Sequence, residues 1–248
     1  MNLQGKRAIV TGGASGFGEG IVRRFVADGA RVVVADRDGD KAEAVARSLG
    51  DAAVAVRADV TVAADVKAMV EAAESRFGGL DILVNNAGMG HLPQPLDEVD
   101  EDLFDRILAL NVKSIYLAAR DVVPRFKAQR SGVILTMAST AGVSPRPRLA
   151  WYNASKGWVI TATRAMAVEL APFGIRVVAL NPVAGETPML STFMGEDTPE
   201  MRAKFLSTIP IGRFSTPEDL GAAAAFLCSD DASLITGVAL EVDGGRCI

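Results

Sequence analysis

The sequence predicts an α/β fold in which helices cover both faces of a seven-stranded parallel sheet. Short runs rich in valine and isoleucine alternate with longer segments of helical periodicity along the 248 residues, and this alternation builds a doubly wound sheet. The short runs are continuously apolar, which indicates strands buried on both faces. No linker, charge block or internal repeat divides the sequence, so a single domain spanning residues 1–248 is expected.

The first part of the chain contains three expected strands and two expected helices. Arg-Ala-Ile-Val at residues 7–10 and Arg-Val-Val-Val-Ala at 31–35 are apolar runs of strand length, and a third run covers 53–56. Helices are expected at 16–28 and 40–49, because both segments space their apolar residues as one face of a helix does.

The middle of the chain continues the alternation with longer helices. A helix at 65–77 precedes a strand at 82–84, and a long helix at 100–127 precedes a strand at 132–137. The long helix has one irregular position, Asn111, within the apolar run Leu-Ala-Leu-Asn-Val. An asparagine is unfavourable inside a helix unless its amide has a partner.

The last part of the chain alternates again but contains one long interruption. A helix at 151–170, a strand at 175–180, a helix at 217–227 and a closing strand at 238–242 are expected. Residues 185–210 are rich in small, polar and acidic residues and show no strong helix cap. We expect this segment to be a mobile substrate lid.

Composition and charge exclude several classes of function. The net charge is −4 and the pI about 5.2, so no nucleic-acid partner is expected. The chain begins without an apolar signal and has no apolar run of roughly 18 residues, so a cytoplasmic protein without membrane contact is expected. With two cysteines, Cys228 and Cys247, and one histidine, His91, neither a metal site nor a serine-hydrolase triad is expected.

A glycine-rich turn follows the first expected strand and predicts a nucleotide site. Residues 11–18 read Thr-Gly-Gly-Ala-Ser-Gly-Phe-Gly, so the glycines have the spacing Gly-x3-Gly-x-Gly. Glycines there let the backbone approach a pyrophosphate, which the helix N-terminus also attracts, as in a Rossmann fold. The candidate residues of this turn are Thr11, Gly12, Ser15, Gly16, Phe17 and Gly18.

Asp36, at the end of the second expected strand, indicates which dinucleotide binds. A carboxylate at this position accepts hydrogen bonds from the adenosine ribose and repels a 2′-phosphate, which favours NAD over NADP. Arg37 follows it and weakens that repulsion. The other interpretation of Asp36 is a turn or capping residue before residues 38–39.

Tyr152 and Lys156 are the candidate catalytic pair. Four residues apart near the start of a helix, they lie on one helical face. A free tyrosine has a pKa near ~10, and a neighbouring ammonium lowers it toward the range of a useful base. Taken alone, the pair also fits an aromatic ring packed on a lysine stem. Ser139, just after the strand at 132–137, can face the same substrate carbonyl.

In this order, these motifs resemble the short-chain dehydrogenase/reductase family, in its compact single-domain branch, over essentially the whole chain. The resemblance rests on residues 11–18, Asp59, Val60, residues 85–88, Asn111, Ser139, Tyr152, Lys156, Asn181 and Pro182. It implies that Tyr152 is the acid and base, and that Lys156 binds the nicotinamide ribose and tunes Tyr152. It also implies that Ser139 positions the substrate oxygen and that Asn111 holds a water linking Lys156 to solvent.

The resemblance implies a set of cofactor contacts as well. Asp59 and Val60 border the adenine, and Asn86 contacts the adenosine or its ribose neighbour. The remaining implied positions are Ala87 and Gly88, at the end of the fourth strand, and Pro182, Val183 and Thr187, beside the nicotinamide. Val183 departs from the family, which often has glycine there. Ser15 stands where relatives that bind the 2′-phosphate often carry a basic residue, which agrees with NAD.

The predicted function is therefore NAD-dependent interconversion of a secondary alcohol and a ketone by hydride transfer, without a metal. A 3-oxoacyl-thioester reductase of the same family is the alternative, against which Asp36 argues. A catalytically silent protein that senses nicotinamide redox state is a third interpretation. The complete set Asn111, Ser139, Tyr152 and Lys156 argues against it, because a sensor does not need all four residues. Arg146 and Arg148 either bind an anionic substrate or are solvated charges of a loop, and the second interpretation is favoured. His91 either contacts the substrate or is a solvated loop residue, and again the second is favoured.

A homo-oligomer, specifically a homotetramer, is also expected. The helices at 100–127 and 151–170 carry more apolar side chains than one sheet face can cover, and such surface commonly packs on a two-fold-related copy. The residues that suggest this are Leu103, Ile107, Leu110, Ile115, Leu117, Trp158, Ile160 and Met166. The family resemblance implies the same assembly.

Overall fold

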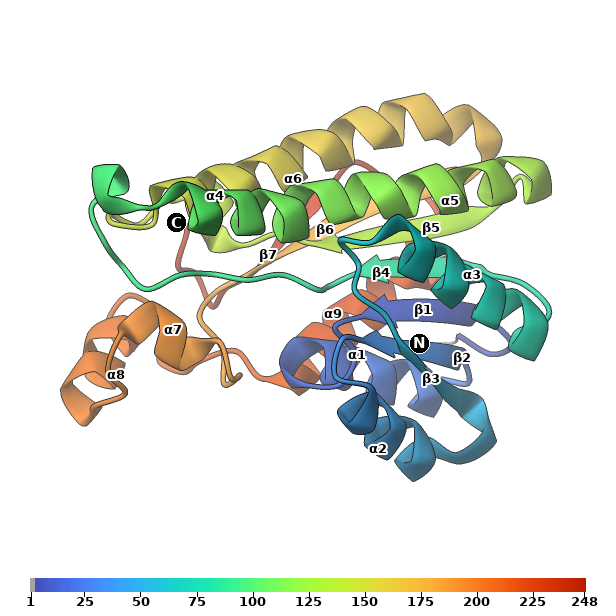
Figure 1. Cartoon of the computed structure of the whole chain (residues 1–248), viewed down its shortest axis with the longest axis horizontal. Coiled ribbons are helices and arrows are strands. Elements are labelled where there is room, and N and C mark those ends of the chain that lie inside the picture. The colour runs from blue at the N-terminus through green and yellow to red at the C-terminus, as the bar shows by residue number, and fades with distance from the viewer. Residues whose placement is uncertain (1–2) are drawn as a thin grey trace.

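Seven parallel strands form one sheet in the order β3-β2-β1-β4-β5-β6-β7 (Figure 1). The computed structural model describes residues 3–248. The strands are β1 Arg7–Thr11, β2 Arg31–Asp36, β3 Ala53–Arg57, β4 Ile82–Asn85, β5 Gly132–Met137, β6 Ile175–Pro182 and β7 Ala239–Val242. The predicted seven-stranded parallel sheet is confirmed, and β2 and β6 extend beyond the expected ends at residues 35 and 180.

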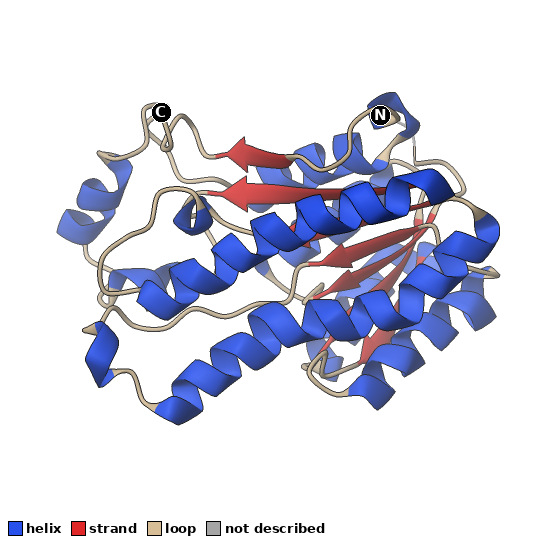
Figure 2. Cartoon of the chain, turned by 90° about the horizontal axis from the view of Figure 1, so that it is seen from above, coloured by secondary structure: helices blue, strands red, loops and turns tan. Residues whose placement is uncertain are grey.

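Helices cover both faces of this sheet (Figures 1 and 2). One layer consists of α1 Gly16–Ala27, α2 Gly39–Leu49 and α9 Pro217–Cys228. The other consists of α3 Ala63–Phe77, α5 Ser114–Gln129 and α6 Ala150–Leu170. Two separate apolar clusters fill the spaces between these layers and the sheet, so the central strands are buried on both faces as their composition predicts, whereas the edge strands β3 and β7 are only partly buried.

The sheet topology determines where a ligand can bind. The chain builds outward from β1 to β3 on one side and returns to β4 on the other side of β1. Because the connections after β1 and β4 diverge there, a crevice opens at the carboxyl ends of these strands. The glycine turn after Thr11 and the polar residues after Asn85 meet at this edge.

The long helix expected at 100–127 is not one regular α-helix. It consists of α4 Glu101–Leu108, a π-helical turn at Ala109–Lys113 and α5. The turn contains Asn111, whose side chain is buried and hydrogen-bonded to two other segments. A π-helical turn inserts one residue into the helical repeat and redirects a side chain, which explains why the irregularity occurs at the asparagine.

The expected lid, residues 185–210, is more structured than its composition indicates. It contains α7 Leu190–Met194 and α8 Pro199–Leu206, and the Thr198 side chain caps α8 by accepting a hydrogen bond from the Met201 N–H at 3.2 Å. The expectation of no strong helix cap in this segment was wrong. The two helices lie beside the main body (Figure 1) and share an apolar cluster comprising Val183, Leu190, Met194, Phe205, Ile209 and Phe214.

Half of the eight apolar side chains that suggested a partner surface are buried inside the chain. Ile107, Ile115, Leu117 and Ile160 are buried in the cores, so this part of the argument for an oligomer was wrong. Trp158, which the sequence analysis also named, is exposed as that argument requires, and two further apolar side chains of the same helices are exposed with it. They are Tyr116 on α5 and Val168 on α6.

No helix within residues 3–248 has both the length and the apolar character needed to cross a membrane.

Candidate active site

One cavity of about 560 Å³ lies at the carboxyl edge of the sheet. Nearly all the predicted site residues line it. They are Gly12, Ser15, Gly16, Phe17, Gly18, Asp36, Arg37, Asp59, Val60, Asn86, Ala87, Gly88, Ser139, Tyr152, Lys156, Pro182, Val183 and Thr187. Two predicted residues do not line it. Thr11 and Asn111 are buried behind its wall and act through other groups.

The glycine turn between β1 and α1 leaves a backbone cradle. Gly12 and Gly16 have φ values of +62° and +54°, a region that favours glycine. A Cβ at Gly12 would lie 3.0 Å from the Asn86 Nδ2 atom, and one at Gly18 would overlap the Gly12 carbonyl oxygen. Glycines therefore let this turn pack closely against Asn86 and the start of α1, so that its backbone stays at the helix N-terminus, where a pyrophosphate would bind.

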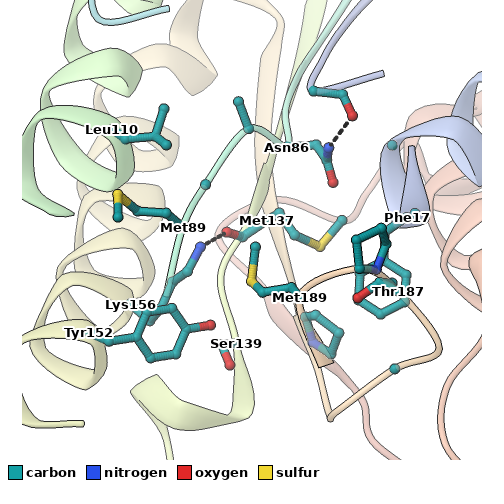
Figure 3. Close-up of a pocket in the computed structure, with 18 of the residues that line it drawn as sticks. Phe17, Asn86, Met89, Leu110, Met137, Ser139, Tyr152, Lys156, Thr187 and Met189 are labelled. Atoms are coloured by element: carbon teal, nitrogen blue, oxygen red, sulfur yellow. Dashed lines mark hydrogen bonds between the residues drawn. The ribbon is translucent and has the colours of Figure 1, made fainter. Parts of the chain in front are cut away.

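Thr11 and Asn86 fasten this turn to the end of β4. The Thr11 hydroxyl accepts hydrogen bonds from the Asn86 and Ala87 N–H groups at 3.0 and 3.1 Å. The Asn86 amide donates to the Thr11 and Gly12 carbonyl oxygens at 2.9 and 3.0 Å, and Figure 3 draws one of these two bonds. The Thr11 side chain therefore shapes the cavity wall from behind, and its direct contact with the cofactor stays a prediction.

Asp36 occupies the adenosine end of the cavity together with Arg37 and Asp59. Its carboxylate accepts hydrogen bonds from the Ala14 N–H at 3.1 Å and from the Asp38 N–H at 3.0 Å. These two bonds hold a negative charge at the end of β2. Asp38, not Asp36, caps α2 through the Lys41 N–H, so the capping interpretation of Asp36 is wrong. The turn interpretation is confirmed, because the bond from the Asp38 N–H to the Asp36 carboxylate is that of an Asx turn.

Asp59 is held at the opposite wall of this end by Thr61. The Thr61 hydroxyl and N–H donate to the Asp59 Oδ1 atom at 2.7 and 2.9 Å. These hydrogen bonds keep the pKa of Asp59 below its usual value, so the group is a carboxylate at neutral pH. Val60 follows it as an apolar surface in the cavity.

Tyr152, Ser139 and Lys156 meet at the other end of the cavity (Figure 3). The Tyr152 side chain is 6% exposed and its phenol lies beside Ser139, whose side chain accepts from the Ala141 N–H at 3.1 Å. The Lys156 ammonium donates to the Met137 carbonyl oxygen at 2.8 Å and lies 5.9 Å from the centre of the Tyr152 ring. The helical spacing thus brings both side chains to one site.

Burial controls the protonation of this pair. It raises the pKa of Tyr152 to about 12, although the neighbouring Ser139 side chain acts in the opposite direction. It lowers the pKa of Lys156 to about 8. The expectation that the lysine lowers the tyrosine pKa is therefore not met in the protein alone, because loss of solvent around the phenol outweighs any stabilisation of the phenolate.

Asn111 is positioned behind Lys156 by the π-helical turn. Its amide exchanges two hydrogen bonds with the Met89 backbone, at 2.8 and 2.9 Å, and donates to the Ser155 hydroxyl at 3.1 Å. A Cβ at Gly88 would lie 3.3 Å from the Asn111 Oδ1 atom and 3.4 Å from the Lys156 Nζ atom. The asparagine therefore joins the loop after β4 to the catalytic helix.

Pro182 and Val183 continue the wall on the nicotinamide side. The Val183 N–H donates to the Val242 carbonyl oxygen at 3.3 Å, and its side chain is buried in the apolar cluster of the lid. Among the described residues, the only non-glycine residues with positive φ are Arg130 and Arg148. A valine is therefore accommodated at position 183 without strain, and Thr187 follows in the cavity lining.

His91 and Arg146 are not the solvated loop residues that the sequence favours. His91 is 4% exposed, its Nδ1 atom lies 2.8 Å from the Leu92 carbonyl oxygen, and its side chain does not line the cavity. Arg146 lines the cavity, half-buried. The loop that contains His91 and the loop that contains Arg146 are joined to each other, because the Gln94 N–H donates to the Arg148 carbonyl oxygen. Arg148 is exposed, as expected.

Sequence reasoning missed three groups in the site. The Met137 carbonyl oxygen accepts the Lys156 hydrogen bond. The Phe193 ring lies 5.0 Å from that of Tyr152, and the Phe205 ring lies 4.4 Å below the Arg146 guanidinium. A backbone carbonyl leaves no signal in a sequence, and the two aromatic residues lie in a segment whose polar composition conceals its small core.

The cavity suits a dinucleotide bound along the sheet edge. The glycine cradle fits a pyrophosphate, Asp36 fits a ribose, and the apolar wall near Pro182 fits a planar ring. The phenol and serine hydroxyl then lie where a substrate oxygen would meet that ring. Such an arrangement can transfer a proton to or from an oxygen while a hydride moves at the neighbouring carbon.

Comparisons with known proteins agree with this geometry. A family model described as enoyl-(acyl carrier protein) reductase matches residues 12–246. The 4-formylbenzenesulfonate dehydrogenase of Comamonas testosteroni is 50% identical over 257 residues, which cover 100% of both chains. Galactitol 2-dehydrogenase of Agrobacterium fabrum is 38% identical, with 99% of each chain covered.

Two solved structures are similar over nearly their whole length. A 3-ketoacyl-(acyl-carrier-protein) reductase from Brucella melitensis, complexed with NADH, is 57% identical with a TM-score of 0.95, covering 100% of each chain. A 7α-hydroxysteroid dehydrogenase complexed with NADH and 7-oxo glycochenodeoxycholic acid is 37% identical with a TM-score of 0.92. The match covers 98% of this chain and 95% of that one.

Proposed function

Because the chain belongs to the short-chain dehydrogenase/reductase family, we propose that it uses NAD to interconvert a secondary alcohol and a ketone, with Tyr152 as acid and base. The chain is an oxidoreductase of this family that binds a nicotinamide cofactor and acts on a small hydroxyl or ketone substrate. Three points are proposals: that Tyr152 is the acid and base, that NAD is preferred over NADP, and that the reacting carbon is that of a secondary alcohol or ketone.

The meeting of Tyr152, Ser139 and Lys156 at one end of the cavity carries the proposal. When bound, NAD(H) supplies the acceptor or donor of the hydride. The chain supplies orientation and the proton. Ser139 donates to or accepts from the substrate oxygen, which it holds beside the Tyr152 hydroxyl. In reduction Tyr152 gives its proton to that oxygen, and in oxidation it removes the proton of the alcohol.

Lys156 and Asn111 assist proton transfer to and from Tyr152. The Lys156 ammonium lies 5.9 Å from the centre of the Tyr152 ring, on the same helix face, and it stabilises the phenolate left after proton donation. Asn111 holds the Met89 backbone beside Lys156 and so supports a water-filled route from the lysine to solvent. Reprotonation of Tyr152 would follow this route.

The direction of the reaction should depend on pH. Since burial keeps the pKa of Tyr152 at about 12 in the protein alone, the phenol is protonated at neutral pH and ready for ketone reduction. Oxidation requires the phenolate, so its kcat/KM should rise with pH. Reduction requires the phenol, so its kcat/KM should fall once the pH passes the pKa of Tyr152 in the complex.

Tyr152→Phe tests the proposal directly. Turnover should fall by about 100-fold or more in both directions, because no other acid or base reaches the substrate oxygen, while NADH binding followed by fluorescence should persist. Tyr116→Phe is the matched control, since Tyr116 is the other of the two tyrosines and is exposed on α5. Retention of about one tenth of the wild-type rate by Tyr152→Phe would exclude the mechanism.

The preference for NAD over NADP is supported by Asp36. Its carboxylate is fixed by two backbone N–H groups at the adenosine end, where it would meet the ribose hydroxyls and repel a 2′-phosphate. The similar structures that contain NADH agree with this preference.

A 3-oxoacyl-thioester reductase is the second candidate. The similar Brucella melitensis structure, named for that activity and complexed with NADH, favours it. Parallel assays of simple ketones and 3-oxoacyl thioesters, each with NADH and NADPH, distinguish the two. A kcat/KM for the thioester far above that of every ketone would replace the main proposal with this one.

We also propose that the enzyme works as a cytoplasmic homotetramer of single-domain chains, each with a lid at residues 185–210. Tyr116, Trp158 and Val168 support an interface, because they form exposed apolar surface on α5 and α6. The lid is supported by Thr187, Met189 and other residues of the segment that line the cavity.

A further inference from the structure

Arg146 is a cation without a partner in the substrate end of the cavity. Its guanidinium is half-buried and lines the same space as Tyr152. Within residues 3–248 it makes no hydrogen bond or ion pair, and its side-chain contact is the Phe205 ring at 4.4 Å. Its nitrogens are not among the buried atoms without a partner, so the charge is only partly removed from solvent and faces the cavity. Partial loss of solvent still makes pairing with an anion favourable.

A second arginine, Arg246, makes this region more positive. Its Nη1 atom donates to the Ser144 hydroxyl at 3.2 Å, and its Nε atom is buried without a hydrogen-bond partner in the described part of the chain. Asp243, in the same C-terminal turn, uses its oxygens to accept the Gly245 and Cys247 N–H groups. Burial and the charge of Arg246 both lower the pKa of Arg146, so the two cations repel each other.

The backbone of Arg146 is held in a defined position relative to Tyr152. Prolines at 145 and 147 restrict the chain on both sides of it. Its carbonyl oxygen accepts a hydrogen bond of 2.7 Å from the side chain of Asn153, the residue after Tyr152 on α6. The guanidinium rests on Phe205, which leaves its edge to meet a planar or tetrahedral oxyanion.

We propose that Arg146, reinforced by Arg246, binds an anionic group, a carboxylate or sulfonate, carried by the substrate at a distance from its reacting carbon. Arginine binds such groups with charge-assisted paired hydrogen bonds. The cavity wall between Arg146 and Tyr152 includes Leu149 and Phe193, so the body of the substrate is apolar. This inference rests on the proposed function and defines the substrate class as hydroxy or oxo anions with an apolar body, in contrast to neutral polyols.

Three matched ketones test the inference. NADH-dependent reduction of 4-acetylbenzoate and 4-acetylbenzenesulfonate is compared with that of neutral 4-acetylbenzamide. In the wild type, kcat/KM for at least one anion should exceed that of the amide by about tenfold or more, mainly through a lower KM. The two anions distinguish a carboxylate site from a sulfonate site.

Arg146→Gln should lower the ratio of anion to amide kcat/KM by about tenfold or more, and Arg146→Lys should retain part of it because it keeps the charge without the planar fork. Arg148→Gln is the matched control, since Arg148 is exposed two residues away and does not line the cavity. It should leave the ratio at the wild-type value. Arg246→Gln should lower the ratio by less than Arg146→Gln.

Binding of unreactive anions separates this inference from the proposed function. Benzoate, benzenesulfonate and benzamide are titrated calorimetrically into the NADH-saturated wild type and into Arg146→Lys. If no ketone is reduced, the proposed function fails, but stronger binding of an anion that weakens in the variant still supports the anion site. If the ketones are reduced and the wild-type ratio is near one, or Arg146→Gln and Arg146→Lys leave it unchanged, the anion site is refuted and the oxidoreductase function stands.

Discussion

Replacing Lys156 by methionine is expected to stabilise the folded protein and to abolish turnover. Lys156 is 6% exposed, and burial lowers its pKa from 10.5 to about 8. At about 1.4 kcal/mol per pKa unit, the difference of about 2.5 means that the charged lysine costs the folded state about 3 kcal/mol. Methionine has a similar length and carries no charge that must lose its solvent.

The gain is partly offset by the hydrogen bond that methionine cannot make. The Met137 carbonyl oxygen, which accepts from the lysine at 2.8 Å, would lose a partner at a cost of about 1–2 kcal/mol. We therefore expect Lys156→Met to raise the free energy of unfolding at pH 7 by about 1–2 kcal/mol. Activity and NADH affinity should both fall, because the ammonium serves both.

The dependence on pH identifies the cause. Between pH 8 and pH 10.5, the buried lysine of the wild type loses its proton, whereas the same lysine in the unfolded chain keeps it. Because the unfolded state then binds more protons, wild-type stability rises with pH by up to about 1.4 kcal/mol per pH unit relative to the variant. The advantage of Lys156→Met should therefore shrink and reverse by about pH 10.

Equilibrium urea unfolding of both proteins at a fixed protomer concentration, from pH 7 to pH 10, measures this difference. Lys67→Met, which removes an exposed lysine of α3, is the control for loss of a lysine side chain. A Lys156→Met protein that is less stable than the wild type at pH 7, or a difference that does not change with pH, would contradict the argument that desolvation dominates at this site.

Three further predictions concern the cofactor, the lid and the assembly. Asp36→Ala should lower the ratio of kcat/KM with NAD to kcat/KM with NADP, whereas Asp40→Ala, at an exposed position, should leave this ratio unchanged. A wild-type enzyme that already prefers NADP would show that the role of the Asp36 carboxylate is misinterpreted. Amides of residues 189–204 should exchange hydrogen more slowly when NADH and an unreactive substrate analogue are both bound than in the free enzyme, because the segment lines the cavity. Equal exchange in the free and bound enzyme would indicate a preformed pocket. Light scattering should give a mass near four times the 26.0 kDa chain, and Val168→Asp, at an exposed apolar position of α6, should lower it; a wild-type mass near that of one chain would rule out the tetramer.

The parts of the site that depend on local spacing could be predicted from the sequence. Tyr152 and Lys156 share a helix face because they are four residues apart, and Ser139 reaches the same edge because it follows a parallel strand. The glycine turn and Asp36 lie at the ends of neighbouring strands, β1 and β2, for the same reason. Asn111 was recognised as irregular, although its π-helical turn was not foreseen, because the apolar pattern alone resembles a continuous helix.

Burial of individual side chains could not be predicted in this way. Arg146 and Arg148 lie two residues apart in one loop with similar composition, yet one enters the cavity and the other is exposed. The difference arises from Phe205, which lies far along the chain and provides the surface on which Arg146 rests. His91 is buried for a related reason, since its loop is held by the segment that precedes α6.

By itself, the sequence determined the order of strands and helices, the edge of the sheet at which the site lies and the residue types that serve it. These properties follow from periodicity and spacing along the chain, which short-range geometry converts directly into position. Only the tertiary structure decided the protonation of the site and the charge of its substrate end. The high pKa of Tyr152 and the low pKa of Lys156 result from loss of solvent, and the place of Arg146 in the cavity results from its packing on Phe205. Both effects come from segments that are distant in the sequence.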